Sequence, residues 1–206
     1  MKVITKAILS IITISLLSCA SGYKTIAPKS INYISKSEAN DVVLEYKYNL
    51  LSKKYAKKED KKGVKLVAVK IANNTDRDLI LGRDINLIFE NGNAVNVLEN
   101  DRAFTNLKQS PTSYLWYLLL TPVNFYTYKT NSRGVEETTS STPVGLILGP
   151  GLAGGNMIAA GSANKNFKNE LSKFNIYGQT IKKGEVKFGL IGIMSNSYES
   201  LKLKVE

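Results

Sequence analysis

Short segments in which apolar and polar residues alternate recur along the chain, and this period-two pattern is typical of β-strands with one buried face. They cover residues 42–50, 64–71, 79–81, 85–89, 94–98, 186–193 and 201–205. Residues 64–71 carry apolar side chains on both faces, which predicts a central strand. Asn91-Gly92 is a strong signal for a two-residue hairpin turn. Together these features predict a mainly β fold, an immunoglobulin-like antiparallel β-sandwich.

The strand pattern stops in the middle of the chain. Residues 113–120, SYLWYLLL, form an apolar run, and residues 163–174 are amphipathic at helical spacing. Between them, residues 127–142 are rich in Thr, Ser and Asn and are predicted to form a polar, mobile loop. We therefore predict a β-sandwich domain over residues 41–206 that contains a helical apolar insertion at about 103–175.

Residues 149–154, GPGLAG, have the G-x-G-x-x-G pattern of dinucleotide-binding loops. That loop belongs to a βαβ unit, whereas the surrounding segments predict antiparallel strands. Gly149-Pro150-Gly151 should break a helix, so we expect two short helices or a strand, a turn and a helix. Residues 143–163 carry no charge and leave three alternatives: a lid packed on the sandwich, a surface for a partner, or a segment in contact with lipid.

Residues 52–63, SKKYAKKEDKKG, contain six lysines and are predicted to form the solvated loop of a charged hairpin. The alternative is a surface for acidic headgroups or polysaccharide. Lysine dominates over arginine throughout the chain, which favours solubilising charge over bidentate phosphate recognition. The formal net charge is +11, and a basic surface gains some attraction beside an anionic membrane.

The residue types exclude several kinds of chemistry. The chain has no histidine and a single cysteine, Cys19, so Ser-His-Asp triads, Cys-His dyads and histidine metal sites are excluded. Asp76, Asp78 and Asp84 cluster near a turn but lack the spacing of an EF-hand. We therefore expect a protein that is not an enzyme, with no catalytic residues, no cofactor and no metal. The alternative is a carboxylate-dependent enzyme that acts on an envelope polymer.

The N-terminus is typical of an exported protein. Lys2 and Lys6 precede an apolar run of about eleven residues, 7–17, which matches the central region of a signal peptide. That run is too short to span a bilayer as a helix. Residues 1–18 are therefore predicted to be a signal peptide.

The end of this signal, Leu16-Leu17-Ser18-Cys19, resembles the lipobox of bacterial lipoproteins. The resemblance implies cleavage between Ser18 and Cys19 and acylation of Cys19, with palmitate as a typical acyl group. Several acyl chains hold a protein on a membrane stably, since each buried CH₂ contributes roughly 0.8 kcal/mol. Residues 19–40 are polar and without a sustained period, which predicts a lipidated tether.

Several further segments resemble uncharacterised outer-membrane lipoproteins of Bacteroidetes-type bacteria. They are VAVKIANNTDRDL, YLWYLLLTP, the glycine-rich segment, ANKNFKNEL and IKKGEVKFGLIGI. The resemblance covers most of the chain after Cys19, and implies an outer-membrane lipoprotein with a sandwich body and no assigned activity. Similar proteins reach the cell surface through acidic residues just after the lipidated cysteine. Residues 20–24, ASGYK, contain none, which favours the periplasmic face.

The apolar insertion contains the candidate contact residues. Trp and Tyr suit the membrane interface, so the aromatic and leucine side chains of SYLWYLLL are candidates for contact with membrane or partner. These residues are Tyr114, Trp116, Tyr117, Leu118 and Leu119. We expect a membrane-anchored envelope lipoprotein, a non-enzymatic binding or scaffolding module whose partner is an envelope protein or polysaccharide and not nucleic acid. A membrane-associating or pore-associated component is a further alternative.

Overall fold

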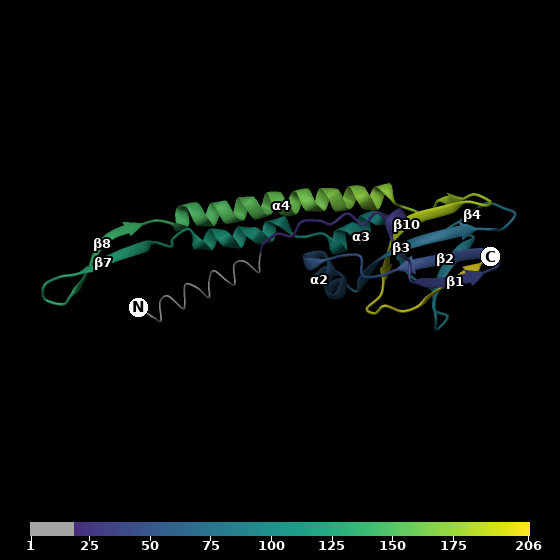
Figure 1. Ribbon diagram of the computed structural model, residues 1–206, viewed down its shortest axis with the longest axis horizontal. Coiled ribbons are helices and arrows are strands. Elements are labelled where there is room, and N and C mark those ends of the chain that lie inside the picture. The colour runs from purple at the N-terminus through teal and green to yellow at the C-terminus, as the bar shows by residue number, and fades with distance from the viewer. Residues whose placement is uncertain (1–18) are drawn as a thin grey trace. The chain divides into compact units, whose positions relative to one another are not determined.

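The computed structural model describes residues 19–206 (Figure 1). The predicted signal peptide, residues 1–18, lies outside the described residues. The chain divides into two compact units. Of the described residues, unit 1 comprises 19–22 and 110–162, and unit 2 comprises 23–109 and 163–206.

Unit 2 is built around a five-stranded antiparallel sheet with the strand order β1-β2-β3-β10-β6. Its strands are β1 (Ser35–Ala39), β2 (Val42–Lys47), β3 (Val64–Asn73), β6 (Val97–Leu98) and β10 (Val186–Met194). Two smaller antiparallel pairs join β5 (Ile85–Phe89) to β11 (Leu201–Val205), and β4 (Leu79–Ile80) to β9 (Thr180–Ile181). A 3-10 helix, η1, covers Pro28–Ser30. Strands make up 33% of the described residues and helices 32%, so the helical part is larger than the sequence pattern predicted.

The first core of unit 2 joins the five-stranded sheet to the β5–β11 pair. Val67 and Val69 of β3 contribute to it together with Ile191 of β10. Leu87 of β5 and Leu203 of β11 belong to the same cluster. The alternation that predicted these strands therefore corresponds to a buried face, as the period of two requires.

The second core lies on the opposite face of the central strands. Leu66 and Ala68, which alternate with Val67 and Val69 along β3, pack here with residues from three helices. The helices are α2 (Lys53–Lys62), α3 (Asn100–Leu107) and the last turns of α4 (Gly145–Lys173). Phe167 and Leu171 of α4 are fully buried in this core, which confirms the amphipathic pattern predicted for residues 163–174. The prediction of a central strand is also confirmed, since β3 is buried along most of its length.

The lysine-rich segment is a helix and not the predicted hairpin loop. Tyr55 and Glu59 are four residues apart in α2 and both are buried, as is Leu51 just before the helix, so one face of α2 is turned into unit 2. Gly63 ends the helix in a left-handed conformation with φ 59°, which glycine adopts without a steric cost. Six lysines in the helix hid these two buried positions in the sequence pattern.

Residues 23–39 are also more ordered than the predicted tether. They include η1 and β1, and β1 pairs along its whole length with β2. Tyr23, Ile26 and Tyr33 pack against the second core. The chain therefore joins unit 2 four residues after Cys19.

Unit 1 consists of a short 3-10 helix, a hairpin and the first part of α4. The 3-10 helix η2 covers Pro111–Leu120, and β7 (Phe125–Thr130) pairs with β8 (Glu136–Thr142). The predicted mobile loop at 127–142 is thus wrong, and Gly134 with φ 78° lies in the turn between the strands. Threonine is favoured in strands, and the polar residues of this segment include many threonines, so β-propensity outweighs polarity here.

The glycine-rich segment forms one continuous helix, although we expected a break at Gly149-Pro150-Gly151. Pro150 lies inside α4 near its N-terminal end. A proline removes the hydrogen bond to the carbonyl four residues earlier, here that of Leu146, so its cost falls on one bond close to the helix start. The 29 residues of α4 keep their remaining helical bonds, and the segment is neither two helices nor a strand–turn–helix.

Candidate membrane-contacting site

The chain next to the predicted acylation site is attached to α4. The backbone N–H of Ala20 donates to Oδ1 of Asn156, at 2.5 Å. The Asn156 side chain is buried and donates in turn to the carbonyl of Leu152, at 2.8 Å. Asn156 is the polar residue that receives the N-terminal segment within an otherwise apolar stretch of helix. Cys19 therefore lies beside α4 in unit 1.

The five candidate contact residues of η2 face different ways. Tyr114 is buried and stacks on Tyr117 with ring centroids 6.4 Å apart. Burial, and then the nearby Cys19, raise the pKa of its hydroxyl. Trp116 and Leu119 are 74% and 68% exposed, and Leu118 is also exposed. The site thus keeps three of the predicted residues as exposed apolar side chains, while Tyr114 helps to pack η2.

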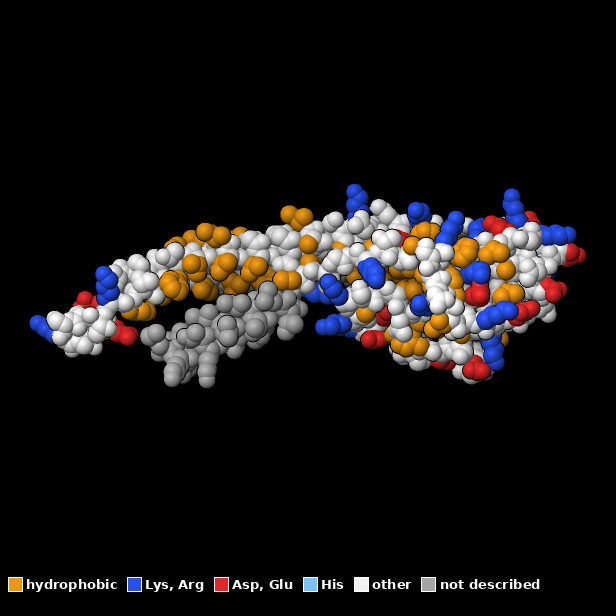
Figure 2. All heavy atoms as spheres, viewed as in Figure 1, with side chains coloured by type: hydrophobic (Ala, Val, Ile, Leu, Met, Phe, Trp, Pro, Cys, Tyr) orange, Lys and Arg blue, Asp and Glu red, His pale blue; other side chains and the backbone are white. Residues whose placement is uncertain are grey.

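The first part of α4 adds exposed apolar residues that sequence reasoning missed. Ile147 and Ile158 are 79% and 75% exposed, and Leu146 and Leu148 are exposed beside Ile147. Figure 2 shows apolar side chains gathered over the part of unit 1 that η2 and α4 form. The signal was the uncharged segment 143–163, but an uncharged segment fits a buried lid equally well. By length and composition α4 is a helix that could cross a membrane, and 22% of its most apolar 18-residue stretch is buried.

Charged residues are absent from most of unit 1. Residues 109–128 and 138–164 carry none. The four charges between them, on Lys129, Arg133, Glu136 and Glu137, all lie in the exposed β7–β8 hairpin. The uncharged parts of unit 1 are therefore interrupted only by this hairpin, which carries four charges.

Gly149, the first glycine of the G-x-G-x-x-G motif, and Gly145 before it allow close packing of two helices. A methyl group on Gly145 would lie 2.1 Å from the carbonyl oxygen of Leu120, and one on Gly149 would lie 2.7 Å from Oγ1 of Thr121. These two glycines let α4 approach the end of η2. Gly151 and Gly155 face open space. Because the motif lies inside a helix, its backbone N–H groups are not free to bind phosphate, and the dinucleotide-loop interpretation is wrong.

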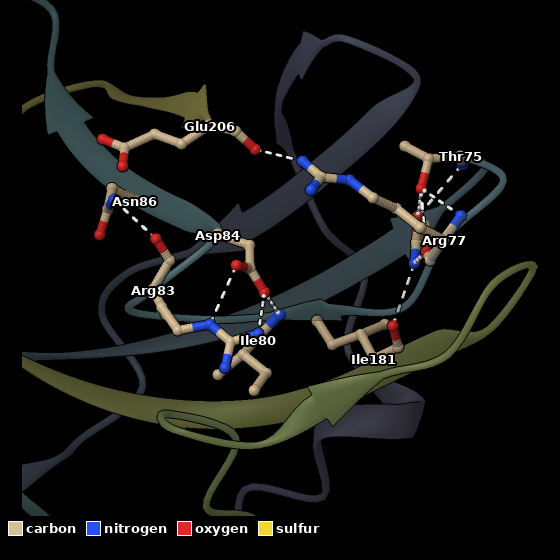
Figure 3. A network of polar contacts seen from close by, with 9 residues as sticks. Thr75, Arg77, Ile80, Arg83, Asp84, Asn86, Ile181 and Glu206 are labelled. Carbon is tan, nitrogen blue, oxygen red and sulfur yellow. Dashed lines mark hydrogen bonds and ion pairs between the residues drawn. The ribbon is translucent and has the colours of Figure 1, made fainter.

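The aspartates near residue 80 stabilise turns. Asp84 accepts hydrogen bonds from Arg83 at 3.0 Å and from the backbone N–H of Ile80 at 2.7 Å (Figure 3). The Arg83 guanidinium holds the pKa of Asp84 below its usual range. Asp78 accepts the backbone N–H of Lys183 at 2.9 Å. Among residues 19–206, no group of three or more His, Cys, Asp or Glu side chains is placed to hold a metal ion.

Two carboxylates are buried in unit 2, and both bind backbone groups. Glu170 of α4 accepts the N–H of Ile26 at 3.0 Å and the hydroxyl of Tyr23. Burial, and then this bond to Glu170, raise the pKa of the Tyr23 hydroxyl. A cavity of about 330 Å³ lies beside Glu170, and among the described residues that line it no second carboxylate is present. The pair of carboxylates that the enzymatic alternative requires is therefore not found in this cavity.

Glu59 of α2 is the second buried carboxylate. It accepts the backbone N–H of Leu66 at 2.8 Å, and burial raises its pKa to about 7. Since this pKa exceeds the value of 4.5 for an unperturbed glutamate, protonation favours the folded state. The stability contributed by Glu59 is full below pH 4.5 and is lost as the pH rises to about 7.

Glu59→Gln should remove this pH dependence, because an amide oxygen still accepts the Leu66 N–H and carries no charge. We expect the variant to gain up to about 3 kcal/mol relative to the wild type between pH 4.5 and pH 8. Urea unfolding at both pH values measures this gain. Glu38→Gln, at an exposed position, is the matched control. An equal stability difference between wild type and Glu59→Gln at both pH values would contradict the prediction.

Comparison of the chain with protein-family models, curated proteins and solved structures gives no match in any of the three.

Proposed function

We propose that this protein is a lipid-anchored, non-enzymatic component of the bacterial envelope. Acyl chains on Cys19 hold it in a membrane, and the apolar side chains of η2 and α4 in unit 1 enter the same bilayer beside those chains. Unit 2 is the module that binds or scaffolds other envelope components. The resemblance to Bacteroidetes-type lipoproteins favours the periplasmic face of the outer membrane.

The observation that carries this proposal is the hydrogen bond from Ala20 to Asn156. It attaches the residue after Cys19 to the helix that exposes Ile147 and Ile158. Acyl chains that start at Cys19 therefore begin beside α4, the helix that exposes these isoleucines on its other side. A core helix of a soluble protein is mostly buried, whereas the most apolar part of α4 is 22% buried. Removing each large apolar side chain from water contributes about 1.5–3 kcal/mol, which favours insertion.

We also infer that unit 2 is an immunoglobulin-like β-sandwich. Its support is the first core, in which side chains from the five-stranded sheet and from the β5–β11 pair pack together. Sandwiches of this kind present loops and faces for binding without any catalytic group. That property fits a binding or scaffolding role.

Vesicle binding by the mature chain without acyl groups tests the membrane contact. Trp116 is the only tryptophan and is exposed on η2, so its emission should shift to the blue when neutral phosphatidylcholine vesicles are added. The double variant Leu119→Ser, Ile147→Ser keeps this reporter and should bind at least about tenfold more weakly. Flotation of the vesicles gives the bound fraction independently of fluorescence.

Ile34→Ser is the matched control, because Ile34 is also 75% exposed but lies in unit 2. We expect it to bind vesicles as the wild type does. Absence of any blue shift, or equal binding by the double variant and the wild type, would reject the membrane contact. The apolar surface would then be assigned to a protein partner, and crosslinking in native membranes would identify it.

A further inference from the structure

Helix α2 concentrates positive charge on the face opposite its buried side. Tyr55 and Glu59 point into unit 2, whereas Lys53, Lys57 and Lys61 are exposed and lie four residues apart. Residues four apart share one face of a helix. Among the described residues, these three lysines take part in no ion pair.

The two acidic residues of α2 do not neutralise this face. Glu59 is buried and binds the backbone of Leu66. Asp60 pairs with the buried ammonium group of Lys65 in β3, at 2.6 Å. The charges of the exposed lysines are therefore left for a partner. Lys58 shows their mutual repulsion, since burial and then the nearby Lys62 and Lys61 lower its pKa.

A short stretch of chain links the acylated residue to Tyr23, which packs on α2. The ring of Tyr23 packs on the ring of Tyr55 in α2, with centroids 5.4 Å apart. Glu170 fixes Tyr23 by accepting its hydroxyl proton in a hydrogen bond. Cys19 precedes Tyr23 by four residues, which span at most about 14 Å. Attraction to anionic headgroups falls off with a Debye length of about 8 Å at physiological ionic strength, so a short link between the lysine-bearing helix and the lipid anchor favours it.

We propose that Lys53, Lys57 and Lys61 form a docking face for the anionic headgroups of the membrane that holds the acyl chains. The face would bind phosphate and carboxylate groups of lipids by charge, without a shaped pocket. This inference rests on the proposed lipid anchoring, and it adds an electrostatic contact to the apolar one. Docking through α2 restricts how unit 2 is turned at the membrane surface.

Two kinds of vesicle separate this inference from the proposed function. The mature chain without acyl groups is tested on neutral phosphatidylcholine vesicles and on vesicles with about a third phosphatidylglycerol. The neutral vesicles report the apolar contact of unit 1 alone. The triple variant Lys53→Gln, Lys57→Gln, Lys61→Gln should bind neutral vesicles as the wild type does, and anionic vesicles 10- to 100-fold more weakly, given roughly a fivefold effect for each lysine near an anionic surface.

The matched control removes the same charge elsewhere in unit 2. Lys182, Lys202 and Lys204 are exposed, and Figure 1 places the C-terminal end of the chain and α2 at opposite ends of the unit 2 sheets. Replacing these three by glutamine should weaken anionic binding less than about threefold. Glutamine is a good helix former, and far-UV circular dichroism checks that α2 persists in the triple variant. In 0.5 M salt the difference between triple variant and control should disappear.

Equal losses in the triple variant and the control would overturn the docking face and leave only an effect of net charge. Binding that is the same on neutral and anionic vesicles would also overturn it, while leaving the apolar contact intact. If the triple variant instead loses binding to a soluble sulfated polysaccharide but not to anionic vesicles, the face is assigned to polysaccharide. Failure to bind neutral vesicles would reject the apolar contact and has no bearing on the lysine-dependent difference.

Discussion

Mature protein with Cys19→Ser, exported by a signal peptide that does not direct lipidation, is expected to leave the membrane fraction for the most part. The loss of the acyl chains removes roughly 0.8 kcal/mol for each CH₂ that had entered the bilayer. A residual fraction should stay bound, because the apolar side chains of η2 and α4 remain. Fractionation of cell envelopes, followed by a carbonate wash, measures both fractions.

The residual fraction should disappear when Leu119→Glu and Ile147→Glu are added. A charged residue at the centre of a membrane helix costs about 2.5–3.5 kcal/mol, and less near the interface. Two such residues should lower the remaining affinity by at least about 100-fold. All these variants carry the replacement signal peptide, so that an uncleaved native leader cannot hold the protein in the membrane.

Cys19→Ser combined with Ile34→Glu is the control, since Ile34 is as exposed as Ile147 but lies in unit 2. It should behave as Cys19→Ser alone. Mass spectrometry of the wild type should find acyl groups on the N-terminal cysteine. Full membrane retention of the Cys19→Ser protein would show that acylation is not what holds it, and a complete release would leave no role for η2 and α4 in the bilayer.

The strands could be predicted because their signal is local. Leu201–Val205 alternates without exception, and Val64–Asn73 is apolar on both faces, so pattern alone indicates an outer and a central strand. The turn at Asn91-Gly92 also needs only neighbouring residues, whereas the pairing of β3 with β10 and of β5 with β11 joins segments more than 100 positions apart and could not be predicted. The helix α2 was missed because its two buried residues, Tyr55 and Glu59, are hidden among six lysines.

The candidate site could be predicted only in part, for a different physical reason. Trp116 and Leu119 belong to an apolar run that composition reveals, whereas Ile147 and Ile158 lie in a glycine-rich segment whose exposure depends on what packs around it. The hydrogen bond between Ala20 and Asn156 joins residues 136 positions apart. No periodicity in either segment points to the other, so this contact becomes visible only in three dimensions.

Phe167→Ala should have the largest effect on folding stability. Phe167 is fully buried in the second core, with the rings of Tyr23, Tyr55 and Phe104 within 6 Å of its own. Truncation of a buried phenylalanine leaves a cavity and costs about 3–5 kcal/mol. Domains are stable by only about 5–15 kcal/mol, so this change removes a large share of the total.

Urea unfolding followed by far-UV circular dichroism measures the loss, and Trp116 fluorescence reports unit 1 separately. Phe167→Leu, which keeps most of the volume, should cost less than about 1.5 kcal/mol. Phe125→Ala is the matched control, because Phe125 is exposed on β7. A loss below about 1 kcal/mol in Phe167→Ala would mean that the aromatic cluster does not hold the helices on the sheet. Phe167→Ala also removes a ring that packs on Tyr23 and so weakens the attachment of Tyr23 to α2. It should therefore reduce the lysine-dependent part of the binding to anionic vesicles. Binding to neutral vesicles should stay the same.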